Sequence, residues 1–177
     1  YAKRIQDSIL PKQEDISLLF PESFILFKPR DIVSGDFYWV AEVEGFKIVS
    51  IADCTGHGVP GAFMSMVGNT LFNQILFEKK ITEPSLVLNS LHKGIMDVLQ
   101  QNKEGSQAQD GMDISFCCID EKAKQMSFSG AKHPIIIIQD EEMQVVKGDP
   151  ISIGGNSKRL DETNEIKFSQ NQISYKK

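Results

Sequence analysis

Two aspartates, Asp36 and Asp53, are the residues of this chain best placed for chemistry. Each lies at the edge of an apolar, β-type run and beside small residues: Ser34 and Gly35 precede the first, and a glycine-rich turn follows the second. Two carboxylates on neighbouring strand ends can converge, and a hard divalent cation such as Mg²⁺ or Mn²⁺ requires oxygen ligands that are rigidly held. The backbone carbonyl of Cys54 would add a third oxygen. The pattern predicts a metal site, against the simpler alternative that both acids cap turns.

Three basic side chains near these acids are candidates for contacting a phosphate group. Lys28 and Arg30 flank the end of the first expected strand and could bind phosphate oxygens, although solvated surface charge explains them equally well. His57 lies between two glycines at the start of an expected helix. Its ring could act as a general acid or phosphate contact, the helix N-terminus could capture an anion, or the ring could simply bond the turn. His133 is interpreted as a turn residue and Asp113 as part of a loop–strand junction.

Composition bounds the class of protein. At 177 residues the chain fits one domain with a real core, and its 41% hydrophobic and 24% charged residues are typical of a soluble globular protein. The net charge of −5 argues against non-specific nucleic-acid binding. The three cysteines are odd in number and lack a metal-type spacing, which favours a reduced, cytoplasmic compartment. No apolar run reaches the roughly 20 residues of a membrane span, although a membrane-attached parent protein stays open.

Hydrophobic periodicity predicts two long helices among many strands. Pro60 opens a helix of about two dozen residues, and Thr82 is expected to cap a second one, with Pro84 in its first turn and His92 on its surface. Residues 12–22 are expected to be irregular. Runs of β-type character predict strands at 24–28, 36–43, 46–52, 113–119, 125–130 and 134–138, with weaker ones at 142–146 and 166–168.

The order of these elements indicates the fold class. Strands come first, with a hairpin expected at Glu44 and Gly45, then two long antiparallel helices, then more strands. Runs of strands around a run of helices point to a layered α+β architecture rather than to βαβ repeats. A nucleotide-binding interpretation of Gly56, His57 and Gly58 therefore lacks both its fold context and a phosphate-binding lysine.

The first ten residues are expected to form a helix that precedes the domain. Ile5 and Ile9 share one helical face, and Pro11 ends the helix. Because the stretch has no N-cap and no initiating methionine, it is interpreted as the end of a longer linker helix from an upstream sensory region. This divides the chain into a linker at 1–11 and a domain at 12–177, and it suggests dimerisation through the helix.

Three motifs stand out in the sequence: Asp31–Trp39, Ala52–Ala62 and Gly130–Pro134, of which the first two are specific together in their order and spacing. With Gly111–Ser115 and Gly148–Ser152 they resemble the metal-dependent protein serine/threonine phosphatases (PPM), and within them the bacterial SpoIIE- and RsbU-like branch. The resemblance implies a β-sandwich flanked by antiparallel helices. It also implies two Mn²⁺ or Mg²⁺ ions whose bridging water attacks a phosphoserine or phosphothreonine, since cations lower the pKa of water and neutralise developing charge.

The resemblance also implies roles for individual residues. Asp53 would bridge both ions, and Asp36 and the Cys54 carbonyl would complete one of them. The family takes further metal aspartates from a C-terminal segment beyond the 177 residues, so a domain truncated at its C-terminus is expected. The implied substrate is a phosphorylated regulatory protein in bacterial signal transduction, under control of the upstream sensory domain. The alternative is a catalytically inactive pseudophosphatase that binds a partner and relays a signal.

Overall fold

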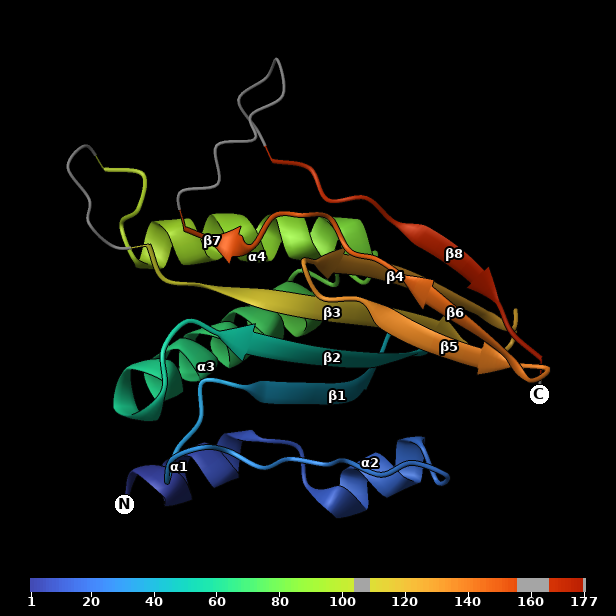
Figure 1. Cartoon of the computed structure of the whole chain (residues 1–177), viewed down its shortest axis with the longest axis horizontal. Helices are drawn as coiled ribbons and strands as arrows, with labels where there is room; N and C mark the ends of the chain where they lie inside the picture. The colour runs from blue at the N-terminus through green and yellow to red at the C-terminus, as the bar shows by residue number, and fades with distance from the viewer. Residues whose placement is uncertain (104–108, 156–165, 177) are drawn as a thin grey trace.

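The computed structural model describes residues 1–103, 109–155 and 166–176. Its centre is an antiparallel sheet in the order β1-β2-β3-β4-β8, with the short strand β7 paired beside β3 (Figure 1). A separate two-stranded sheet is the hairpin of β5 and β6. The strands are β1 (Phe37–Val43), β2 (Phe46–Cys54), β3 (Gly111–Asp120), β4 (Gln125–Ala131), β5 (Ile135–Gln139), β6 (Glu142–Val146), β7 (Ile153–Gly154) and β8 (Asn171–Ser174).

Two long helices cover one face of the main sheet. α3 (Gly58–Asn73) continues into the π-helical turn η1 (Gln74–Glu78), and α4 (Pro84–Val98) packs against β3, β4 and β7. Two shorter helices, α1 (Ala2–Ile9) and α2 (Gln13–Leu19), lie beyond β1 in Figure 1, where α1 contacts α3 and α2 contacts β1. The expected α+β combination of helices and antiparallel strands is confirmed. None of the described helices has the length and apolar character needed to cross a membrane.

The core lies between the main sheet and the two long helices. Phe72 of α3 is fully buried, and its ring lies 6.2 Å from that of Phe37, 5.7 Å from Trp39 and 5.8 Å from Phe116, centroid to centroid. These partners come from β1 and β3, so one side chain ties the helix to two non-adjacent strands. Gly68, one turn earlier, permits this packing, because a Cβ there would lie 2.8 Å from the Phe37 ring.

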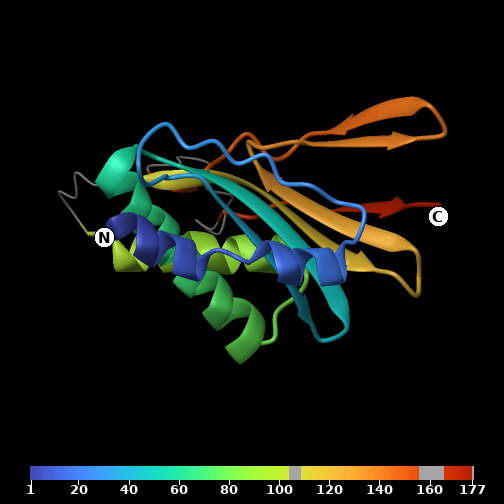
Figure 2. The same cartoon turned by 90° about the horizontal axis from the view of Figure 1, so that it is seen from below.

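We call the opposite face of the main sheet the outer face. Along β2, Ser50 and Ala52 are buried on the helix side, whereas the alternate residues Ile51 and Asp53 are exposed on the outer face. Figure 2 shows that the β5–β6 hairpin and the blue segment following α2 lie on this same side, away from α3 and α4. Asp53 therefore projects from the outer face rather than into the core.

The prediction of a strand at residues 24–28 is wrong. The segment is extended and its side chains alternate, with Phe24 and Leu26 exposed and Phe27 half-buried, but it belongs to none of the strands in the described part of the chain. The Phe27 ring packs edge-on against Tyr38, with centroids 5.6 Å apart. The alternation of side chains thus indicates a segment that has one face on the sheet. It does not show whether the backbone hydrogen-bonds to a neighbouring strand.

Two expectations near the helices are also wrong. Residues 12–22 are not irregular, because they contain α2, which is anchored by the buried side chain of Ile16. The second long helix is not capped by Thr82. It begins at Pro84, and Glu83 is its N-cap in a β conformation, since a residue that precedes proline is disfavoured in the helical region.

Two later assignments need correction. His92 is half-buried rather than on the surface: its Nδ1 accepts a hydrogen bond from the Gly154 N–H at 3.0 Å, and burial lowers the pKa of the ring. No strand forms at 166–168, where the Phe168 N–H donates to the Asn89 side chain at 3.0 Å. The strand in this part of the chain is β8, which pairs with β4.

Candidate functional site

Strand pairing brings Asp36 and Asp53 together. Phe37 lies opposite Ala52 in the β1–β2 pair. Asp36, one residue before β1, therefore comes beside Asp53 at the end of the pair, close enough for the two carboxyls to hydrogen-bond. Phe37 and Ala52 are buried against the helices, so the alternation of side chains directs both acids to the outer face. The two acids predicted from the sequence converge at one point.

Burial and the neighbouring acid raise the pKa of Asp36. Partial burial disfavours its charged form, and the charge of Asp53 and the hydrogen bond between the two carboxyls add to this effect, while His133 opposes it. Two carboxylates at such close range repel each other when both are ionised. A divalent cation bound by both would relieve that repulsion, which is the electrostatic pattern expected where two carboxylates share a metal ion.

We expect Asp36→Asn to raise the melting temperature of the metal-free protein at neutral pH by about 1–3 °C, because relief of repulsion at a partly exposed site is worth on the order of 1 kcal/mol. The sign follows from the raised pKa of Asp36. The native state binds this proton more tightly than the unfolded chain, so the group stabilises the fold below the ordinary aspartate pKa, and this stabilisation is lost as the pH rises through the native-state pKa.

The advantage of Asp36→Asn should therefore shrink on acidification. Thermal unfolding in EDTA, followed by circular dichroism across pH, measures the effect. Asp15→Asn on α2, where the side chain is exposed, is the matched control. A lower melting temperature for Asp36→Asn at neutral pH would show that the two carboxyls do not meet.

The loops that carry the two acids are in backbone contact. A Cβ on Gly35 would lie 2.7 Å from the Gly56 carbonyl oxygen and 3.1 Å from that of Cys54, and a Cβ on Gly61 would lie 2.9 Å from the Gly35 Cα. The Cys54 carbonyl therefore faces the residue next to Asp36, where it could join the carboxylates as a ligand. The Cys54 thiol is buried in the core instead, and burial and the two aspartates raise its pKa.

A cavity of about 630 Å³ opens beside the acids, between the outer face and the segment that follows α2. Its charged lining residues are Asp36, Asp53 and Lys28, and His133 lies with them, while most of the remaining lining is apolar. Of the predicted phosphate contacts, Lys28 thus shares a cavity with the acids. Arg30 is exposed and lies outside that lining.

His57 lies immediately before α3. Gly56 and Gly58 have φ angles of 88° and 61°, so both adopt the left-handed backbone conformation where the chain turns from β2 into α3. The His57 Nδ1–H donates to the Asp31 carboxylate at 2.9 Å, and both side chains are exposed. This contact fixes the orientation of the ring, and the role of His57 stays a prediction.

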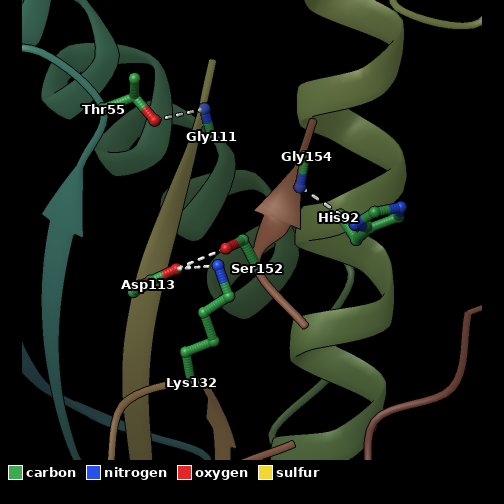
Figure 3. A network of polar contacts seen from close by, with 7 residues as sticks. All are labelled: Thr55, His92, Gly111, Asp113, Lys132, Ser152 and Gly154. Carbon is green, nitrogen blue, oxygen red and sulfur yellow. Dashed lines mark hydrogen bonds and ion pairs between the residues drawn. The ribbon is translucent and has the colours of Figure 1, made fainter. Parts of the chain in front are cut away.

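Asp113 lies closer to the acids than the sequence indicated. It stands opposite Asp53 in the β2–β3 register, so its side chain shares the outer face with the acid pair. Figure 3 shows the two partners of its carboxylate Oδ1: the Ser152 hydroxyl, which donates at 2.5 Å, and the Lys132 Nζ, which lies 4.0 Å away. Its motif is visible in the sequence, but its position opposite Asp53 depends on pairing between strands that are far apart in the sequence.

His133 lies on the same cavity as the two acids, although the sequence indicated only a turn residue. The Ser115 hydroxyl donates to the Pro134 carbonyl at 3.1 Å, so its oxygen is left to accept from His133 Nδ1 at 3.0 Å. The position of His133 near Asp36 on the cavity could not be predicted from the Gly130–Pro134 motif, because a motif does not show where a turn folds.

The oxygen atoms that converge at the site suit a hard cation, but they are too few to fill its coordination sphere. Within the described ranges, no group of three or more histidine, cysteine, aspartate or glutamate residues could hold a metal ion. Asp36, Asp53 and the Cys54 carbonyl supply oxygen atoms, and Mg²⁺ commonly combines one or two carboxylates with several waters. The residues fit one such ion, and both the binding of metal and the number of ions stay predictions.

A family model and solved structures identify relatives of this chain. The model for stage II sporulation protein E (SpoIIE) matches residues 45–170. That range includes Asp53, Cys54 and His57 but begins after Asp36. A search of curated proteins finds no match.

The solved structures share this fold. The SiaA-PP2C domain of Pseudomonas aeruginosa matches with a TM-score of 0.80 and 29% identity, over 98% of this chain and 64% of that chain. The SpoIIE PP2C phosphatase domain of Bacillus subtilis, solved with a fragment of its regulatory domain, matches with a TM-score of 0.59 and 21% identity, over 81% of this chain and 38% of that one. RsbX in complex with magnesium gives a TM-score of 0.58 at 15% identity, over 87% and 67% of the two chains.

The chain thus spans 64% of the SiaA-PP2C chain, less than two thirds of its length. The SpoIIE model, by contrast, matches well over half of the 177 residues. The antiparallel sheet, the covering helices and the motif-bearing loops agree with that match. The chain belongs to the SpoIIE family of PPM (PP2C-like) phosphatase domains.

Proposed function

We propose that this chain hydrolyses phosphoserine or phosphothreonine on a regulatory protein, with Mn²⁺ or Mg²⁺ as cofactor, in bacterial signal transduction. The observation that carries the proposal is the convergence of Asp36 and Asp53 at the end of the β1–β2 pair. Family membership supports phosphatase chemistry, and the magnesium complex of RsbX supports a divalent cation. The domain would act in the cytoplasm, alone or as the cytoplasmic part of a membrane-attached sensor.

Each candidate residue has a distinct role in this proposal. Asp53, Asp36 and the Cys54 carbonyl would hold the cation. When bound, such an ion supplies an activated water and neutralises charge on the phosphate. Lys28 would bind the non-reacting phosphate oxygens from the cavity edge. His57, oriented by its contact with Asp31, would contact the phosphate or donate a proton to the leaving oxygen. Arg30, outside the cavity lining, could reach a phosphate only from the rim.

Control by an upstream sensory region belongs to the same proposal. The SpoIIE structure that shares this fold includes a fragment of a regulatory domain. Helix α1 precedes the domain and contacts α3, so a signal that arrives through this helix would reach the element that begins beside the acids. Dimerisation through α1 is proposed on the same basis.

Phosphate release from phosphoserine and phosphothreonine peptides by the full-length protein tests the proposal. We expect release to require added MnCl₂ or MgCl₂, to stop with EDTA and to recover when the metal is restored. A matched phosphotyrosine peptide is the control for substrate class. Metal binding without hydrolysis would favour the pseudophosphatase alternative, and no metal binding would contradict the site itself.

A further inference from the structure

Helix α1 is joined to the rest of the domain by a buried polar side chain. Gln6 is the buried residue of α1, with 5% of its surface exposed, whereas Ile5 on the same helix is 48% exposed. An apolar anchor is the common way to attach an amphipathic helix. A buried amide instead requires specific hydrogen-bond partners, because leaving it unpaired costs about 1–3 kcal/mol.

The partners of Gln6 lie in the loop that carries Asp36. Its Nε2 donates to the Ser34 carbonyl at 2.6 Å and to the Ser65 hydroxyl at 3.0 Å, and its Oε1 accepts from the Ser34 N–H at 2.9 Å. The side chain thus holds both backbone groups of one residue. The Ser34 hydroxyl in turn accepts from the Asp36 N–H at 3.0 Å. A continuous chain of hydrogen bonds runs from α1 to the backbone of the candidate metal ligand.

This loop depends on such contacts for its position. β1 begins only at Phe37, so the pairing of β1 with β2 does not include residues 34–36. Gly35 is already pressed against the backbones of Gly56 and Gly61. The loop is therefore confined on one side by the turn after β2 and on the other by Gln6.

We propose that Gln6 is a positioning residue for the metal site: through Ser34 it holds Asp36 where it can share a cation with Asp53. The inference rests on the proposed function, because it concerns the metal of that same site. Loss of the Gln6 amide leaves Ser34 without its backbone partners and lets Asp36 move away from Asp53. Groups that orient metal ligands through hydrogen bonds typically contribute about 10–100-fold to metal affinity.

Three variants separate positioning from simple helix anchoring. Gln6→Leu removes every hydrogen bond of the amide at similar volume. Gln6→Glu keeps an acceptor for the Ser34 N–H but loses the donors. Ser34→Ala leaves the contacts of Gln6 with the Ser34 backbone in place and removes only the hydroxyl that binds the Asp36 N–H. Gln13→Leu on α2 is the matched control, because Gln13 is exposed.

Two measurements on the full-length protein test the proposal: Mn²⁺ affinity by calorimetry, and amide hydrogen exchange of the metal-free protein. We expect about 10-fold weaker Mn²⁺ binding in Gln6→Leu and Gln6→Glu, a smaller loss in Ser34→Ala, and no change in Gln13→Leu. Exchange should accelerate in the peptide that spans residues 31–38, while β3 and β4 remain as protected as in the wild type.

Variants of Gln6 that bind Mn²⁺ as tightly as the wild type overturn the inference alone. A second pair of results would also overturn it: faster exchange throughout β3 and β4 in the Gln6 variants, together with wild-type Mn²⁺ affinity in Ser34→Ala. The weaker Mn²⁺ binding of the Gln6 variants would then be explained by loss of folding. A flat calorimetric titration of the wild-type protein would show that it binds no Mn²⁺. That result would overturn the proposed function and this inference with it.

Discussion

Asp53→Asn is expected to lower metal-dependent phosphate release by about 10³-fold or more. The substitution keeps the size of the side chain but removes the negative charge of the acid that sits between Asp36 and Asp113 on the outer face. Metal-ion catalysis contributes several kcal/mol of transition-state stabilisation, and each 1.36 kcal/mol is about a factor of ten in rate. Initial rates on a phosphopeptide at saturating MnCl₂ measure the loss.

The variant should fold as well as the wild type, because removing one of two repelling carboxylates relieves strain in the metal-free state. Circular dichroism and melting temperature verify this. Asp15→Asn, on the exposed side of α2, should retain full activity. Wild-type rates for Asp53→Asn in a correctly folded protein would exclude the metal mechanism.

Phe72→Ala is expected to destabilise the fold by about 3–5 kcal/mol, the usual cost of truncating a buried phenylalanine. The ring is fully buried and contacts Phe37, Trp39 and Phe116, so its loss leaves a cavity between α3 and two strands. At this chain length the melting temperature should fall by roughly 10 °C. Urea unfolding followed by circular dichroism measures the free energy directly.

Phe77→Ala is the matched control for that prediction. Phe77 also contacts the Trp39 ring, at 5.8 Å between centroids, but 49% of its surface is exposed. Its truncation removes less buried area and leaves no enclosed cavity, so the loss should be about 1 kcal/mol. Equal losses for the two variants would mean that Phe72 is not at the centre of the core.

The hairpin and the acid pair could be predicted from the sequence for a physical reason. Glu44 and Gly45 both adopt positive φ, at 51° and 82°, as a two-residue hairpin turn requires. Such a turn fixes the register of the flanking strands. Asp36 and Asp53 are equally far from the turn along the chain, so the register of the hairpin, continued one residue beyond β1, brings them to the same end of the pair.

The rest of the site depends on contacts that a local pattern does not specify. Asp113 reaches Asp53 only through the β2–β3 pairing, and two helices separate these strands in the sequence. His133 reaches the cavity through a turn held by Ser115. The contact between Gln6 and Ser34 joins residues that are 28 positions apart. Pairings of this kind are decided by tertiary packing, which a single sequence does not display.

The burial of Cys54 beside the acids, and of the other cysteines, determines how these thiols react with electrophiles. Cys54 is 4% exposed and Cys118 is 7% exposed. Burial raises the pKa of Cys117 to about 12 and that of Cys118 to about 11, and it raises that of Cys54 as well. The nucleophile of a cysteine is its thiolate. In the native state at neutral pH these sulfurs are therefore poor targets for alkylation and oxidation, and they become reactive only when the sheet opens.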